Sequence, residues 1–168
     1  MVNNLKEVVL LSFMTAVLFI QQIALSAIPN IQFSFLLVAV YTKAFGARNT
    51  MIITLLHVFA NVLIYGGYMY VIAPFMVLGY WSVIAIVQVT PRSKKNYNIR
   101  LAVAGFIGSL TYSWILAIPS IFILGLNWKL YLAADLVWEL VLGLSSFITI
   151  LFLFEPLEKA LKNYKERK

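Results

Sequence analysis

Long apolar runs separated by short polar segments dominate this chain. Residues 8–28, for example, contain no Asp, Glu, Lys or Arg, and a helix needs about 20 apolar residues to cross a hydrocarbon core of roughly 30 Å. The pattern predicts six transmembrane helices, at residues 5–27, 31–46, 49–65, 70–89, 99–124 and 130–155. No linker or internal repeat divides them, so we expect one all-α domain over residues 1–168.

The composition places this domain in a membrane. Hydrophobic residues make up 62% of the chain and charged residues 11%, whereas soluble domains contain roughly 45–50% apolar and about 25% charged residues. The first apolar run exceeds the h-region of about 7–15 residues that is typical of a signal peptide, and no A-x-A-like cleavage site follows it. We therefore interpret this run as helix 1 of an integral membrane protein.

The positive charges are distributed unevenly over the six-helix pattern. Only one of the 13 Lys and Arg residues, Lys129, falls in an outer loop. The inner loops and tails hold the others: Lys6, Lys43, Arg48, Arg92, Lys94, Lys95, Arg100, Lys159, Lys162, Lys165, Arg167 and Lys168. The positive-inside rule then predicts that both termini are cytoplasmic. We therefore expect the net charge of +7 to set the orientation in the membrane and to contact anionic lipid, rather than to bind nucleic acid.

Helix 2 is the least regular of the predicted spans. Residues 33–46 would cover only about 20 Å as a helix, so we expect this helix to be tilted or shielded by residues 26–34. Pro29 favours extended backbone before it and places Asn30 and Gln32 near the outer surface. We expect these residues to form a loop that folds over the bundle.

Two further segments lie between or beyond the helices. The polar insert at residues 90–100 forms the long inner loop, and Pro91 marks the end of helix 4. After Pro156, Leu157 and Leu161 are spaced i, i+4 with lysines on the other faces. This spacing predicts an interfacial amphipathic turn.

Polar side chains converge on the outer half of the pattern. Such groups are costly at membrane depth and are candidates for function, although many only bond a neighbouring helix. Asp135 and Glu139, one helical turn apart, either form the wall of a ligand pocket or are explained by an ion pair with Lys129 or by hydrogen bonds to tyrosine hydroxyls. The convergent set is Gln21, Gln22, Asn30, Gln32, Asn61, Tyr65, Tyr68, Tyr70, Asn127, Trp128, Tyr131, Asp135 and Glu139.

Several kinds of chemistry are missing from the sequence. There is no Cys, and His57 is the only His, so no thiolate site or second imidazole is available to share a metal. We therefore interpret His57 as an interhelical hydrogen-bonding group. The chain contains no Walker A loop, G-x-S-x-G, H-E-x-x-H or dinucleotide fingerprint. We expect no catalytic residues, no metal, no bound cofactor and no enzyme activity.

Helix 1 carries a pair of small residues. Ser12 and Ala16 are spaced i, i+4, which permits the close approach of another helix, either within the bundle or from a partner.

The chain resembles the substrate-binding S components of energy-coupling factor (ECF) transporters over nearly its whole length. The likeness rests on LLSFMTAVLFIQQ in helix 1, on IPNIQFSFLLVAVYTKAFG, and on ADLVWELVLGLSSFITILFLFEPLEKALK. Ser12 and Ala16 stand in place of the family's AxxxA. Asp135 and Leu136 match the D-L-x-H-A-x-G-N motif of the last helix, whereas Trp138 and Glu139 replace its His and Ala.

The resemblance implies a subunit in a bacterial plasma membrane that captures a vitamin and delivers it inward by toppling. Its implied partners are one transmembrane coupling subunit, which would dock on Ser12 and Ala16, and two cytoplasmic ATPases. The stretches SAIPNIQFSFLL and YTKAFG look most like cobalamin-specific members, so vitamin B12 is the expected ligand. Pantothenate, a queuine precursor and hydroxymethylpyrimidine are the alternatives. A secondary transporter and a membrane scaffold are the competing functions.

Depth and convergence select the residues that we expect at the ligand. Asn30 and Gln32 would close over it from the first outer loop. The predicted contact residues in the helices are Gln21, Asn61, Tyr65, Trp128, Tyr131 and Asp135.

Overall fold

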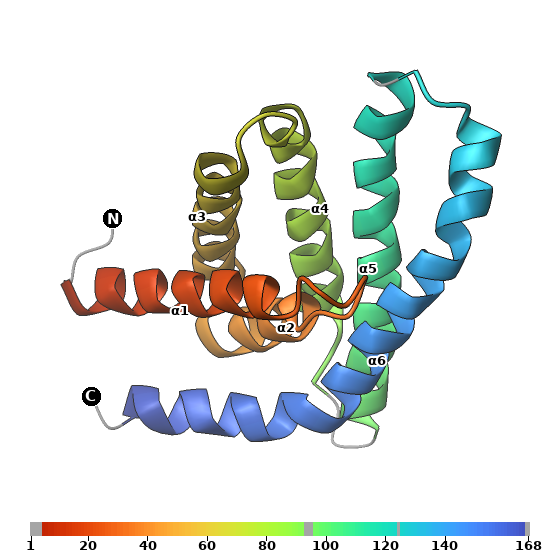
Figure 1. The fold of residues 1–168 in the computed structure, drawn as a ribbon. Coiled ribbons are helices and arrows are strands. Elements are labelled where there is room, and N and C mark those ends of the chain that lie inside the picture. The colour runs from red at the N-terminus through yellow and green to blue at the C-terminus, as the bar shows by residue number, and fades with distance from the viewer. Residues whose placement is uncertain (1–4, 93–95, 124, 167–168) are drawn as a thin grey trace.

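The fold is a bundle of helices (Figure 1). The computed structural model describes residues 5–92, 96–123 and 125–166, with side chains as far as residue 163. The six helices are α1 (Leu5–Ala24), α2 (Ser34–Phe45), α3 (Ala47–Tyr65), α4 (Met69–Val89), α5 (Tyr97–Phe122) and α6 (Trp128–Glu166). The described residues contain no strand. The predicted all-α class and the predicted order of six helices are confirmed.

Five of the helices are long and apolar enough to cross a membrane, and α2 is not among them. With 12 residues, α2 covers about 18 Å. It is short because residues 25–33 form turns before it and because it ends at Gly46, whose φ of 86° suits glycine. A sixth span over residues 31–46 is therefore not confirmed.

Protein rather than lipid surrounds α2. This helix contacts α1, α3, α4, α5 and α6, and all residues from Ser34 to Thr42 except Leu37 are buried. Phe35 and Tyr41 are among the largest fully buried side chains of the chain. The other helices thus shield a segment that is too short to span by itself.

Glycines allow α4, α5 and α6 to pack closely. A Cβ atom on Gly79 of α4 would stand 2.6 Å from Cδ2 of Tyr112 on α5, and one on Gly105 of α5 would collide with Ile150 of α6. No larger residue fits at either position without movement of its neighbour.

The last helix is longer than predicted. We expected helix 6 to end at residue 155 and a separate amphipathic turn to follow, but α6 continues through Pro156 to Glu166. Pro156 provides no N–H for the helical ladder, which favours a bend, and α6 changes direction in its lower part (Figure 1). Leu161 packs against the core, so the tail is part of the bundle.

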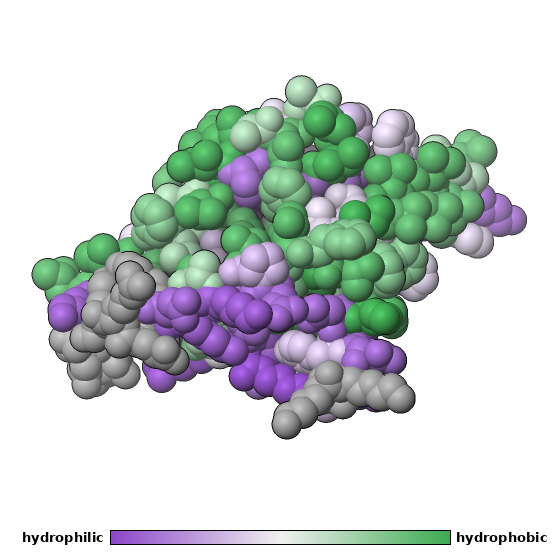
Figure 2. Space-filling model, turned by 90° about the horizontal axis from the view of Figure 1, so that it is seen from below, coloured by the Kyte–Doolittle hydropathy of each residue, from purple (hydrophilic) through white to green (hydrophobic). Residues whose placement is uncertain are grey.

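A polar cluster joins the ends of α2, α4 and α6. Lys43 Nζ donates to the carbonyl of Thr90 at 2.8 Å. Arg92 donates to the carbonyl of Lys43 at 2.7 Å and pairs with Glu158 at 2.8 Å. We call this region the cationic end. Seen from below, hydrophilic residues form a band beside a broad hydrophobic surface (Figure 2).

The cationic end contains residues that the sequence placed in inner loops. Lys43, Arg92 and Lys162, which are far apart in the chain, contact one another or share Glu158 as a partner. Lys94, Lys95, Arg167 and Lys168 lie outside the described residues, as does the side chain of Lys165.

Candidate functional site

A cavity of about 220 Å³ lies beneath the loop that follows α1. Because α3 starts beside the cationic end and finishes at Tyr65, this cavity lies at the opposite end of α3. We call it the loop pocket. It is lined by Gln22, Leu25, Ser26, Ile28, Pro29, Asn30, Ile31, Gln32 and Tyr65. Three predicted ligand contacts, Asn30, Gln32 and Tyr65, are thus brought together.

The lining of the loop pocket is polar but uncharged. Its side chains offer three amides, two hydroxyls and aliphatic surface, so it can form neutral hydrogen bonds in either direction. Asn30 adopts a φ of 57°, a left-handed conformation that Asn tolerates better than most residues.

Gln21 holds the base of this loop. Its Oε1 accepts the N–H of Phe33 at 2.9 Å, and its Nε2 donates to Oγ of Ser34 at 2.7 Å and to the carbonyl of Leu18 at 2.9 Å. The Ser34 hydroxyl in turn donates to Oε1 of Gln32 at 3.0 Å. The amide of Gln21 is thus occupied by protein partners. Its predicted contact with a ligand stays a prediction.

A second chain of polar groups runs from the loop pocket into the core. Gln22 Nε2 donates to Oδ1 of Asn61 at 2.9 Å, and Asn61 Nδ2 donates to the carbonyl of His57 at 2.9 Å. The Tyr80 hydroxyl lies 3.3 Å from Nε2 of His57. Asn61 and His57 are fully buried. His57 therefore has the interhelical bonding that we expected, and Gln22 separates Asn61 from the loop pocket.

The α6 side of the site presents three polar residues at intervals of four. Tyr131, Asp135 and Glu139 share one helix face, which we call the acidic stripe. Glu139 is only 6% exposed, and its Oε1 accepts a long hydrogen bond of 3.4 Å from Ser113 of α5. The stripe therefore faces α5 at this level.

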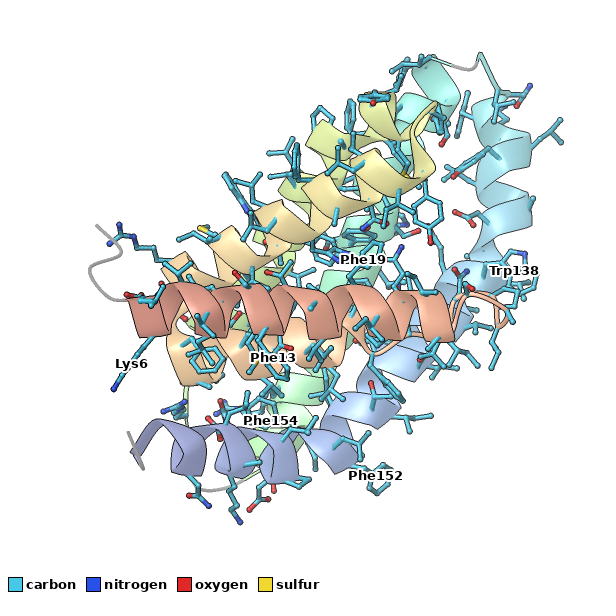
Figure 3. All side chains as sticks on the ribbon, turned by 60° about the vertical axis from the view of Figure 1, so that its left-hand side comes forward. Lys6, Phe13, Phe19, Trp138, Phe152 and Phe154 are labelled. Atoms are coloured by element: carbon cyan, nitrogen blue, oxygen red, sulfur yellow. The ribbon has the colours of Figure 1, made fainter. Side chains whose placement is uncertain are left out.

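One hydrogen bond connects the loop to this part of α6. Asn30 Nδ2 donates to the carbonyl of Trp138 at 3.0 Å. Figure 3 places Trp138 beside the loop after α1, at the opposite end of α1 from Lys6. The predicted loop over the bundle is thus anchored next to the acidic stripe.

Trp128 contributes an exposed ring at the start of α6. Its exposed fraction is 57%, and Nζ of Lys129 lies 5.5 Å from the ring centroid. Within the described residues, the ion pairs all lie at the cationic end, so Lys129 pairs with neither Asp135 nor Glu139. The alternative interpretation of these acids as partners of Lys129 is not supported.

The predicted set of ligand contacts omitted two residues that belong to this region. Gln22, rather than Gln21, lines the loop pocket, and Glu139 is the more buried of the two acids. Both residues were in the convergent set. The sequence positions alone do not tell whether Gln21 or Gln22 points into the pocket, or which of Asp135 and Glu139 is buried.

The small residues of α1 remain exposed. Ser12 and Ala16 are both exposed and lie on one face with Val9, Phe13 and Ile20. Packing within the described part of the chain therefore does not account for this pair.

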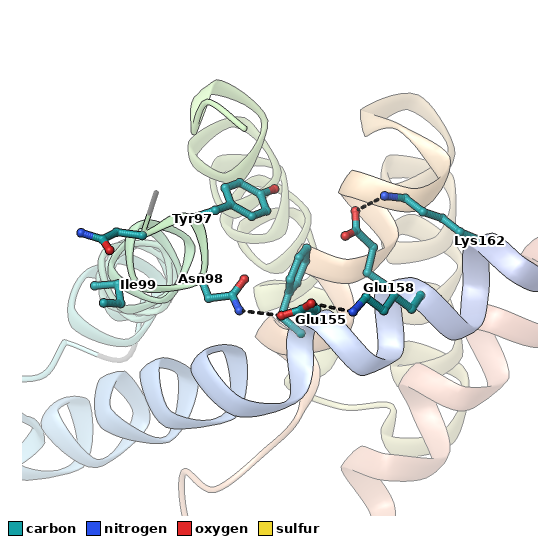
Figure 4. Close-up of a pocket in the computed structure, with 9 residues that line it drawn as sticks. Tyr97, Asn98, Ile99, Glu155, Glu158 and Lys162 are labelled. Atoms are coloured by element: carbon teal, nitrogen blue, oxygen red, sulfur yellow. Dashed lines mark hydrogen bonds and ion pairs between the residues drawn. The ribbon is translucent and has the colours of Figure 1, made fainter. Parts of the chain in front are cut away.

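A larger cavity, of about 550 Å³, lies between the start of α5 and the last part of α6 (Figure 4). Its charged groups neutralise one another: Glu155 pairs with Lys159 at 2.7 Å and Glu158 with Lys162 at 2.9 Å. Asn98 also donates to Glu155 at 3.2 Å. The charged side chains of this cavity thus have partners within the protein, and we do not assign a ligand to it.

The described residues contain no group of three His, Cys, Asp or Glu side chains that could hold a metal ion. The chain matches no family model, no curated protein and no solved structure. Its function must therefore be argued from its own residues.

Proposed function

We propose that this protein is the S component of an ECF-type importer and binds a vitamin or vitamin precursor. The observation that carries the proposal is the loop pocket, in which Asn30, Gln32 and Tyr65 meet under a loop anchored to α6. Ligand sites commonly combine apolar walls with a few polar groups that fix orientation. The uncharged lining suits an organic molecule better than an inorganic ion.

The proposed ligands differ in size. The sequence resemblance favours cobalamin, with pantothenate, a queuine precursor and hydroxymethylpyrimidine as alternatives. The loop pocket has about 220 Å³, whereas pockets for drug-sized ligands measure roughly 300–1,000 Å³. Cobalamin would therefore require residues 25–33 to open, whereas a pyrimidine would need little movement.

The proposed partners are a transmembrane coupling subunit and two cytoplasmic ATPases, which would supply ATP hydrolysis. The exposed pair Ser12 and Ala16 supports docking of the coupling subunit on α1, because small residues let two helix backbones approach closely. The flanking apolar side chains Val9, Phe13 and Ile20 would pack against that partner. Substrate would then move inward as the subunit topples.

We also propose a bacterial plasma membrane as the location, with both termini in the cytoplasm. This orientation would put the cationic end at the anionic inner leaflet and the loop pocket outside.

Binding to the purified full-length protein tests the proposal. Calorimetry in detergent with cobalamin, pantothenate, a queuine precursor and hydroxymethylpyrimidine is expected to give saturable one-to-one binding of one compound. Asn61→Ala should weaken that binding, because Asn61 orients Gln22 at the pocket. Absence of binding by every compound to a folded, monodisperse preparation would contradict the proposed function.

A further inference from the structure

We infer that the loop pocket selects a compact, uncharged ligand that is rich in N–H donors and carries a carbonyl acceptor. This inference rests on the proposed function, because it describes the ligand of the same pocket. It follows from the hydrogen bonds that the polar side chains of the pocket already make to the rest of the protein. Each of these bonds uses one end of a side chain and leaves the other end for a ligand.

The Asn30 amide is oriented by a backbone carbonyl of α6. Its Nδ2 donates to the carbonyl of Trp138 at 3.0 Å, and a carbonyl oxygen can only accept. The amino end of Asn30 is therefore occupied by the protein. Its acceptor end, Oδ1, has no partner among the hydrogen bonds of the described residues and is available to a ligand.

The Gln22 amide is oriented from the core by α3. Asn61 Nδ2 donates to the carbonyl of His57 at 2.9 Å, so Oδ1 is the end of Asn61 that remains for Gln22. Gln22 must then present its amino group, and its Nε2 donates to this oxygen at 2.9 Å. Oε1 of Gln22 is left as a second acceptor. Since Asn61 is fully buried, this orientation is held from inside the bundle.

The Gln32 amide is oriented in the opposite sense. The N–H of Phe33 can only donate, so it fixes Oε1 of Gln21 as its acceptor, and Nε2 of Gln21 donates to Oγ of Ser34 at 2.7 Å. Ser34 has a single hydroxyl proton, which it donates to Oε1 of Gln32 at 3.0 Å. Nε2 of Gln32 is therefore the end that is left, and it is a donor.

The two hydroxyl groups of the lining differ in the same way. Ser26 donates its proton to the carbonyl of Ile23 at 2.8 Å, so its oxygen can only accept from a ligand. Tyr65 is exposed, and its hydroxyl can donate or accept. The pocket thus holds three acceptors of fixed orientation against one fixed donor: Gln22 Oε1, Ser26 Oγ and Asn30 Oδ1 against Gln32 Nε2.

This uneven set discriminates between ligands. An acceptor that loses its water without gaining a donor costs free energy, and a site built to bind N–H groups rejects an analogue that lacks them. The lining residues carry no charge, so they offer no counter-charge to an ion. An uncharged ring with several N–H groups beside a carbonyl, such as an aminopyrimidinone, meets these requirements.

Asn61 and Ser34 act as positioning residues. Neither lines the pocket, but Asn61 fixes the orientation of Gln22 and Ser34 fixes that of Gln32. Without its partner, each glutamine amide can rotate and present either end to a ligand. Loss of Asn61 or Ser34 should therefore reduce the discrimination between ligands, whereas a purely structural role would weaken the binding of all ligands equally.

Two fused-ring probes of similar size test this inference on the full chain in detergent. 7-Deazaguanine carries a ring N–H, an amino group and a carbonyl on its polar edge, whereas 7-deazaadenine carries one amino group beside an unprotonated ring nitrogen. We expect calorimetry to show about 10- to 100-fold tighter binding of 7-deazaguanine. In Asn61→Ala this preference should fall to about threefold or less, because either end of the Gln22 amide can then meet the probe.

The matched control is Asn49→Ala on the same helix. Asn49 donates to Glu7 at 3.4 Å near the start of α3, away from the pocket, and its loss should leave the preference unchanged. If Asn61→Ala fails to fold, Ser34→Ala decides.

Three results would overturn the inference and leave the proposed function standing. The first is equal binding of the two probes or a preference for 7-deazaadenine. The second is a preference that persists in the folded variant, Asn61→Ala or Ser34→Ala. The third is binding of cobalamin or pantothenate without binding of 7-deazaguanine. Absence of binding by both probes and by every compound tested for the proposed function would overturn both.

Discussion

Replacement of Gln21 by Met tests how the loop over the pocket is held in place. Met has nearly the same length and remains apolar, but it can neither accept the N–H of Phe33 nor donate to Ser34. Ser34 would still donate to Gln32, so its hydroxyl keeps a partner. The substitution therefore removes the links between α1 and the loop with little change in volume.

The expected magnitude follows from two hydrogen bonds, at 2.9 Å to the N–H of Phe33 and at 2.7 Å to Ser34. Each contributes about 1 kcal/mol net, so their loss favours loop opening by about 2 kcal/mol. A free-energy change of about 1.4 kcal/mol is tenfold in an equilibrium constant, which gives about a 30-fold increase in the open population.

Hydrogen exchange of residues 25–33 provides the assay. The Ile28 amide, which donates to the carbonyl of Leu25 at 2.9 Å, does not contact Gln21 and therefore reports movement of the whole loop. We expect its exchange to accelerate about 30-fold, because exchange of a bonded amide requires local opening.

Gln88→Met is the matched control, since Gln88 is exposed near the end of α4, far along the chain from the loop. If Ile28 exchanged at the wild-type rate in Gln21→Met, the loop would be held by its own turns. The assigned role of Gln21 would then be wrong.

Three further experiments address docking, packing and orientation. Ala16→Trp should leave ligand binding by the isolated subunit within twofold but abolish ATP-driven uptake; Leu63→Trp on α3, also exposed, is the control, and unimpaired uptake would reject the docking face. Gly79→Val should lower stability by about 1–3 kcal/mol, because the ring of Tyr112 must move; thermal unfolding in detergent measures this, and an unchanged midpoint would contradict the packing. Since the chain has no Cys, a single Cys in place of Lys129 should react with an impermeant maleimide in intact cells, whereas one in place of Arg92 should react only after permeabilisation. The reverse pattern would invert the proposed topology.

The apolar runs predicted the helices well because the backbone N–H and C=O groups of a segment in lipid must bond to one another, and a helix achieves this within the segment. The same reasoning predicted a sixth membrane span at residues 31–46, where the structure has the shorter helix α2. Apolarity does not distinguish a residue that faces lipid from one that faces protein. The fully buried Val38 and Val40 of α2 would be equally suitable on a lipid face. Helix 6 was predicted to end at residue 155, yet the chain continues as a helix through Pro156.

Of the predicted ligand contacts, Asn30, Gln32 and Tyr65 line the loop pocket, but the sequence pattern did not predict how the polar side chains are connected. Gln21 and Gln22 differ by about 100° around α1, and only the packing of α3 decides that Gln22 meets Asn61. The bond from Asn30 to the carbonyl of Trp138 joins residues separated by 108 positions. A backbone acceptor that distant leaves no signature in the local pattern.

The short, enclosed helix α2 has a consequence for biogenesis. A segment of 12 residues is too short to leave the translocon as an independent span, and its surroundings come mostly from helices that are synthesised later. Only Gly46 separates it from α3, so the two segments must enter the bilayer as one unit. Nascent chains truncated shortly after residue 46 should therefore remain accessible to proteases or chaperones, whereas chains that extend beyond α3 should be integrated.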